Sequence, residues 1–251
     1  MPPSPAQPLC RRILVPLACL LAAILASTPA AAQPCEPEWL PGEGIPGFSS
    51  ELFEAVMWDP DGPGAAGEQL VVTGVFEIAG DIVADSIAMW DPATGAWSPL
   101  GTGMRMPSDQ VRALAVLPNG DLVAAGTFGA AGGVEVDNIA RWDGTAWHPL
   151  AAGVDQARAM AIHPSGDLIV GGFQYVARWN GSDWSFLGSG MDHYVNALAV
   201  LPSGDIVAGG LFGRAGGVSV ARIARWDGTQ WNPMGSGSLE GVGFSSRRAA
   251  I

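Results

Sequence analysis

A block of residues recurs four times along this chain, and this repetition limits the available folds more than any other feature. Each copy has an apolar stretch that ends in Pro, a second apolar stretch that ends in Gly, and then two Trp residues. The first stretches are Ala55–Pro60, Ala113–Pro118, Ala159–Pro164 and Ala197–Pro202, and the second are Leu70–Gly74, Leu122–Gly126, Leu168–Gly172 and Ile206–Gly210. The Trp pairs are Trp90 and Trp97, Trp142 and Trp147, Trp179 and Trp184, and Trp226 and Trp231. The Gly and the first Trp are 16 residues apart in three copies and 7 in the third, which has therefore lost nine residues at one place.

Each copy is predicted to form four short strands. Turns such as Asn119-Gly120-Asp121 and Asp143-Gly144-Thr145 lie between apolar runs of strand length, and Gly and Asx residues are typical of hairpin turns. Four antiparallel strands repeated along a chain are typical of a β-propeller blade. We therefore predict an all-β fold, a β-propeller of four-stranded antiparallel blades with four complete blades in an incomplete ring. A closed four-bladed ring is the alternative.

The repeats also predict the organisation of the chain. The four blades are expected at 52–104, 105–154, 155–191 and 192–238, the third being short. An N-terminal segment, 33–51, precedes them, and within it Trp39-Leu40-Pro41-Gly42 resembles the last strand of a blade. The apolar pattern stops after Val242, so residues 239–251 are expected to form a frayed or truncated C-terminus.

Residues 1–32 have the pattern of a signal peptide. Arg11 and Arg12 precede an apolar run from Ile13 to Ala26, and Ala30-Ala31-Ala32 offers a cleavage site before Gln33. The run is short for a membrane span, although an uncleaved anchor is the alternative. We expect the mature protein to be secreted or in the cell envelope, with no membrane attachment after cleavage.

The second half of each copy resembles the kelch repeat. In Met89-Trp90-Asp91-Pro92-Ala93-Thr94-Gly95-Ala96-Trp97 an aromatic-Asp pair is followed by a second Trp, and Gly171-Gly172 and Gly209-Gly210 resemble the kelch double glycine. The likeness covers residues 52–238, with Thr73-Gly74 and Ala125-Gly126 departing from the diglycine. Secreted bacterial repeat proteins have similar turns. The resemblance implies a kelch-like propeller, a class that includes a copper radical oxidase. The resemblance would imply a site of Tyr and His ligands with one Tyr cross-linked to a Cys, whereas this chain has only Tyr175 and Tyr194, and Cys35 lies outside the blades.

Composition excludes several classes of function. The chain has 24 acidic residues against 12 basic ones, a formal net charge of −12, so binding of nucleic acid is not expected. Three Cys residues are too few for a disulfide scaffold or a multi-cysteine metal site. The three His residues fall at different positions in the repeats, so we predict neither a metal site nor a cofactor.

Recurring residues divide into structural and candidate binding positions. The eight paired Trp residues are interpreted as packing residues between blades, and the recurring Asp residues as turn residues. One residue before each innermost strand the sequence has Glu54, Arg112, Arg158 and Asn196, which a common register would bring to one height near the central channel. Connections expected on the same face include Phe128–Asn138, Phe212–Arg222 and Gly190–Tyr194, which contains His193 and Tyr194. No catalytic motif appears.

These observations favour a secreted, non-catalytic binding or surface-interaction module with a protein or glycan ligand on the loop face. An extracellular enzyme acting on carbohydrate through acidic residues of that face is one alternative, and a purely structural spacer is another. Open blade edges are expected to allow self-association.

Overall fold

The computed structural model describes residues 47–61, 67–104, 110–151 and 154–235. The predicted signal peptide, the strand expected at residues 39–42 and the predicted C-terminal segment 239–251 lie outside them. No helix in the described part is long and apolar enough to cross a membrane.

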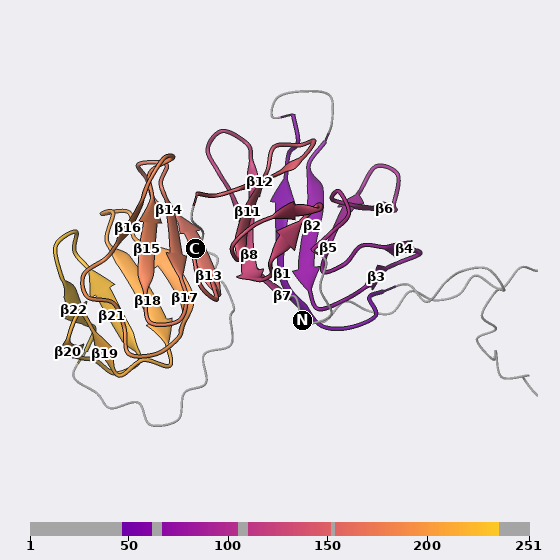
Figure 1. Cartoon of the computed structure of the whole chain (residues 1–251). Helices are drawn as coiled ribbons and strands as arrows, with labels where there is room; N and C mark the ends of the chain where they lie inside the picture. Colours follow the sequence, from indigo (N-terminus) through magenta and orange to yellow (C-terminus); the bar gives the residue numbers. More distant parts are fainter. Residues whose placement is uncertain (1–46, 62–66, 105–109, 152–153, 236–251) are drawn as a thin grey trace, which may run out of the picture. The chain divides into compact units, whose positions relative to one another are not determined.

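Each repeat folds as one four-stranded antiparallel sheet, with its strands in chain order from one edge to the other (Figure 1). The first sheet contains β1 (Leu52–Trp58), β2 (Gln69–Gly74), β5 (Ile87–Asp91) and β6 (Ala96–Pro99). The second contains β7 (Gln110–Val116), β8 (Leu122–Thr127), β11 (Ile139–Trp142) and β12 (Trp147–Pro149). The third contains β13 (Ala159–Ile162), β14 (Leu168–Gly171), β15 (Val176–Trp179) and β16 (Trp184–Phe186). The fourth contains β17 (Val195–Val200), β18 (Ile206–Gly210), β21 (Ile223–Trp226) and β22 (Trp231–Pro233). The all-β fold built of four-stranded antiparallel blades is confirmed.

Three sheets carry an additional two-stranded hairpin between their second and third strands. These hairpins are β3 (Ile78–Ala79) with β4 (Ile82–Val83), β9 (Ala130–Ala131) with β10 (Val134–Glu135), and β19 (Arg214–Ala215) with β20 (Val218–Ser219). The segments 128–138 and 212–222, expected to be loops, therefore contain paired strands. The third sheet has no such hairpin among its described residues, and the nine residues missing from its repeat are those that build it elsewhere.

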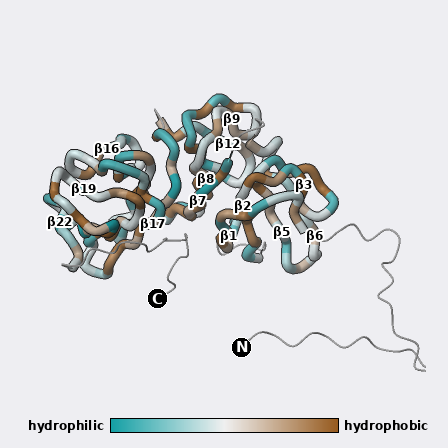
Figure 2. Tube along the Cα trace, turned by 90° about the horizontal axis from the view of Figure 1, so that it is seen from below, coloured by the Kyte–Doolittle hydropathy of each residue, from teal (hydrophilic) through white to brown (hydrophobic). Residues whose placement is uncertain are grey.

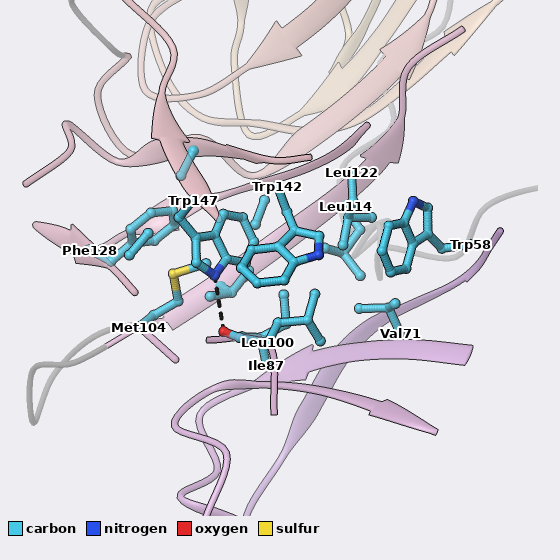
Figure 3. Close-up of a cluster of buried hydrophobic side chains, with 14 residues drawn as sticks. Trp58, Val71, Ile87, Leu100, Met104, Leu114, Leu122, Phe128, Trp142 and Trp147 are labelled. Atoms are coloured by element: carbon cyan, nitrogen blue, oxygen red, sulfur yellow. Dashed lines mark hydrogen bonds between the residues drawn. The ribbon is translucent and has the colours of Figure 1, made fainter. Parts of the chain in front are cut away.

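Neighbouring sheets pack through apolar faces, and hydrophobic and hydrophilic stretches alternate along the chain (Figure 2). Between the first two sheets lie Trp58, Val71, Ile87, Leu100 and Met104 from the first and Leu114, Leu122, Phe128, Trp142 and Trp147 from the second (Figure 3). The innermost strands contact one another in chain order, β1 with β7, β7 with β13 and β13 with β17. The described strands of the first and fourth sheets share no comparable contact, so the ring is not closed by them.

The second Trp of a pair fixes its sheet to the preceding one. The indole nitrogen of Trp147 donates a hydrogen bond to the carbonyl oxygen of Leu100 at 3.0 Å, as the dashed line in Figure 3 shows. Trp184 donates likewise to Leu150 O at 3.2 Å, and Trp231 to Leu187 O at 2.8 Å. Burying the indole ring removes a large apolar area from water, and the hydrogen bond of its N–H fixes where the two sheets meet.

Candidate functional site

A β-bulge occurs at the same place in three innermost strands. The pairing of β1, β7 and β17 with their neighbours skips one residue, and the skipped residues are Phe53, Arg112 and Asn196. In the third sheet Arg158 directly precedes the equivalent pair, because Ala159 pairs with Gly171 as Ala113 pairs with Ala125. We refer to Phe53, Arg112, Arg158 and Asn196 as the bulge row.

A glycine opposite each bulge allows the backbones to approach closely. A Cβ added to Gly126 would lie 1.9 Å from the carbonyl oxygen of Gln110, and one added to Gly210 would lie 2.1 Å from that of Tyr194. Gly74 meets Glu51 O in the same way at 2.0 Å. Only glycine tolerates such an approach, so the Gly that ends the second apolar stretch positions the bulged residue in the first, second and fourth sheets.

Glu54 does not belong to this row. It pairs with Thr73 inside β1, one position beyond the bulge, and Phe53 takes the place that corresponds to Arg112. The Glu54 carboxylate instead accepts a hydrogen bond from the backbone N–H of Leu114 in the second sheet, at 2.9 Å. The sequence register, counted back from Pro60, was wrong by one residue here because β1 has one more paired residue before its turn, Trp58 with Gln69, than β7 has.

Consecutive members of the bulge row interact with one another. The Arg112 guanidinium carbon lies 4.7 Å from the centre of the Phe53 ring, and an Arg158 nitrogen lies 3.5 Å from the side-chain oxygen of Asn196. Arg112 also donates a hydrogen bond to Gln110 Oε1. Burial, and after it the positive charge of Arg158, lowers the pKa of the Arg112 guanidinium, although an arginine remains protonated at neutral pH. The row therefore concentrates two positive charges in a half-buried position.

Tyr194 joins the row through Arg158. The Arg158 guanidinium carbon lies 3.5 Å from the centre of the Tyr194 ring, and the Tyr194 hydroxyl donates to Gln156 Oε1 at 2.6 Å. Phe173 packs against Tyr194 with ring centres 4.8 Å apart, and His193 lies at the exposed side of this cluster, 5.3 Å from Tyr194. The structure thus brings together five predicted binding residues: Arg112, Arg158, Asn196, Tyr194 and His193.

Neither arginine of the row has an ion pair with a carboxylate in the described ranges. Arg141, Arg178 and Arg225 differ in this respect, since each pairs with an aspartate: Arg141 with Asp121, Arg178 with Asp167 and Arg225 with Asp205. Arg214 and Arg222 also form no ion pair with a carboxylate in these ranges, but both are exposed, whereas Arg112 and Arg158 are half-buried. Two half-buried arginines that influence each other's charge and have no carboxylate partner form an anion-binding arrangement.

The Asp–Arg pairs were missed by sequence reasoning. The three aspartates were interpreted as turn residues, and each does follow the turn that joins the first two strands of its sheet. Their arginine partners occupy the third strand, in the repeated segment Ala-Arg-Trp. In the first repeat Gln69 and Met89 replace both members, a joint change that could have indicated the contact.

The eight paired Trp residues lie in the third and fourth strands or directly at their ends. Trp142, Trp147 and Trp231 are buried, and Trp90, Trp97, Trp179, Trp184 and Trp226 are half-buried. Ring centres within a pair lie 5.2–6.5 Å apart. The described residues contain no group of three or more His, Cys, Asp or Glu side chains able to hold a metal ion.

No family model matches the chain, and no curated protein matches its sequence. Among solved structures, it is similar to the extracellular domain of a B. thetaiotaomicron protein assigned to the hybrid two component systems, with 13% identity and a TM-score of 0.49, over 75% of this chain and 22% of that one. It is also similar to virginiamycin B lyase from Staphylococcus aureus, with 12% identity and a TM-score of 0.48, over 69% and 55% of the two chains. A third similarity is to the WD40 β-propeller domain of Doa1, with 14% identity and a TM-score of 0.40, over 64% and 48%.

The chain thus spans about a fifth of the length of the first of these proteins, 22%. Similarities at this level carry no conclusion about what the chain binds. Its propeller-type architecture follows from its own strand order and sheet contacts.

Proposed function

We propose that this chain is a non-catalytic binding module of the kelch-like propeller class, secreted or held in the cell envelope, that binds a carboxylate group of a glycan or protein ligand at the bulge row. The N-terminal sequence pattern supports export. The two neighbouring, half-buried arginines without carboxylate partners support the anionic ligand, and this observation carries the proposal.

The surroundings of the arginines suit a carboxylate. Arg112 is held between Phe53 and Gln110, and Arg158 between Tyr194 and Asn196, so both guanidinium groups are positioned before a ligand arrives. A planar guanidinium matches the two oxygens of a carboxylate, and preorganisation reduces the entropy cost of binding. Asn196, the Tyr194 hydroxyl and the exposed His193 add polar groups beside them.

Calorimetric titration with acidic polysaccharides and with polyglutamate tests the proposal. Arg112→Ala and Arg158→Ala should each weaken binding about ten- to a hundredfold, because a hydrogen bond to a charged group contributes roughly 1.5–3 kcal/mol. Arg214→Ala is the matched control: Arg214 is an exposed arginine of the β19–β20 hairpin and should leave affinity unchanged. A neutral polysaccharide should not bind.

The competing role of the two arginines is structural. If they only fill the channel, Arg112→Ala and Arg158→Ala would lower the melting temperature and no acidic ligand would bind to the parent protein. Binding that is equally strong in the parent and both variants would reject the bulge row as the site.

A further inference from the structure

Each contact between neighbouring sheets uses the same pair of elements. An apolar residue directly follows the last strand of one sheet. Its carbonyl oxygen accepts a hydrogen bond from the second Trp of the next sheet's pair. Leu100, Leu150 and Leu187 are these apolar residues, and each is at most 7% exposed. Where the following residue is Gly, as at Gly101 and Gly188, it lies under the arriving Trp rings.

The fourth sheet also has an apolar residue directly after its last strand, but no Trp pair from the described residues packs against it. Met234 follows Pro233 as Leu150 follows Pro149, yet Met234 is 40% exposed and Leu150 only 3%. An added Cβ at Gly235 would meet nothing within 4 Å.

The apolar face beside Met234 is open as well. We call Ala199, Val207, Ile223 and Met234 the back face. Their counterparts in the second sheet, Ala115, Val123, Ile139 and Leu150, are all at most 3% exposed beneath the third sheet. In the fourth sheet, Ala199 is exposed and Val207 and Ile223 are half-buried.

The first sheet carries the complementary element. Trp97 is the only second Trp of a pair whose indole nitrogen has no hydrogen bond within the described ranges, and its partner Trp90 is half-buried. Trp97 is nevertheless positioned for docking. Gly80 contacts its ring as Gly132 contacts the ring of Trp147.

Phe48 packs on Trp97 with ring centres 4.9 Å apart and does not replace the missing partner. Phe48 bridges to Ala79 as Met191 bridges to Ala215 at the interface of the third and fourth sheets. Phe48 therefore corresponds to Met191, which is not the residue that accepts the Trp hydrogen bond at that interface, and the position corresponding to Leu100 is left open among the described residues.

We propose that the back face of the fourth sheet binds the Trp90–Trp97 face of the first sheet in a second copy of this chain, with Trp97 Nε1 donating to the carbonyl oxygen of Met234. The argument is continuity with an existing interface, because three internal contacts already show which element covers such a face. The resulting contact is head-to-tail, joining different surfaces of the two copies.

Sedimentation velocity on the exported product of the full chain, over a wide concentration range, tests this. The parent should associate reversibly. Met234→Asp places a charge on the back face and should weaken association at least about tenfold, because a charge buried without a partner is unfavourable. Val134→Asp is the matched control, since Val134 is likewise 40% exposed but lies on the β9–β10 hairpin, and it should associate as the parent does.

Mixing two blocked variants separates head-to-tail contact from other arrangements. Met234→Asp and Trp97→Ala should each be monomeric alone, yet a mixture should form a one-to-one dimer, since one copy keeps an intact back face and the other an intact Trp face. If Trp97→Ala does not fold, Trp97→Phe should weaken association about two- to tenfold, the effect of losing one hydrogen bond. A parent that is monomeric at all concentrations, a Met234→Asp variant that associates normally, or a mixture that stays monomeric would each overturn the proposal.

Discussion

Tyr175 lies in the short connection between β14 and β15, where the other three sheets have a two-stranded hairpin. Its ring is 8% exposed and lies against Gly172, where an added Cβ would be 2.5 Å from the phenol oxygen. Its hydroxyl has no hydrogen-bond partner in the described part of the chain. Burial, with the charge of Asp155 as a lesser cause, raises the pKa of the Tyr175 hydroxyl. Burying the aromatic ring stabilises the folded state, whereas burying its unpaired hydroxyl destabilises it.

Tyr175→Phe is therefore expected to stabilise the protein by about 1 kcal/mol, because it removes an unsatisfied buried polar group and keeps the ring. The raised pKa adds a pH dependence. Folding favours the neutral phenol, so this contribution is fully present below about pH 10, the unfolded pKa, and is lost as pH rises toward the folded pKa. The free energy of unfolding measured in urea should therefore exceed that of the parent by a larger amount in Tyr175→Phe above pH 10 than below it. An equally large loss of stability in the variant would indicate a partner for the hydroxyl.

At the scale of elements, the strands and turns were predictable and the register only in part. Apolar runs and Gly-containing turns predicted four strands in each repeat, and each sheet has four. The bulge was not predictable, because it results from the close approach of two backbones at Gly74, Gly126 and Gly210, which no local pattern encodes. Glu54 was misplaced because β1 has one more paired residue before its turn than β7 has. The hairpins of the insertions were missed because their strands are only two residues long.

The pairing of Asp121 with Arg141 joins the turn before β8 to β11 and can be tested by a double-mutant cycle. Arg141→Met alone should cost about 1–2 kcal/mol, since Asp121, with a side chain only 12% exposed, would lose its partner. Adding Asp121→Gln recreates the Gln69 and Met89 combination of the first repeat and should recover part of that loss. Urea unfolding of the four variants gives the coupling energy, expected near 1 kcal/mol. Additive effects would show that the pair contributes nothing.

At the scale of the whole molecule, the repeats predicted four blades in an incomplete ring, and the described strands form four sheets of which the first and last share no comparable contact. Each sheet is stabilised mainly by its neighbours in the chain, as the separate clusters between consecutive sheets show. Stability in such an array is close to a sum over interfaces, and one interface can open without the others. Sequence alone does not show which faces at the two ends of the array are covered.

Trp231→Ala is expected to loosen the fourth sheet alone. It empties a site that is 2% exposed and removes the hydrogen bond to Leu187, a change that costs roughly 3–5 kcal/mol. Hydrogen exchange should accelerate in β17, β18 and β21, while protection of β8 and β11 is unchanged. Trp147→Ala, the equivalent change in the second sheet, should reverse the pattern. Uniform acceleration across all four sheets would instead indicate a single cooperative unit.

The bulge row separates the part of a blade that must stay constant from the part that can vary. A glycine opposite the bulge recurs in the first, second and fourth sheets, whereas the bulged residue itself is Phe53, Arg112 or Asn196. The side chain at the bulge is released from the pairing pattern of the sheet, so exchanging it changes no strand contact. The bulge row therefore provides one exchangeable side chain in each blade. Recognition of a new ligand could arise by substituting single residues of the bulge row while the sequence of the surrounding strands stays the same.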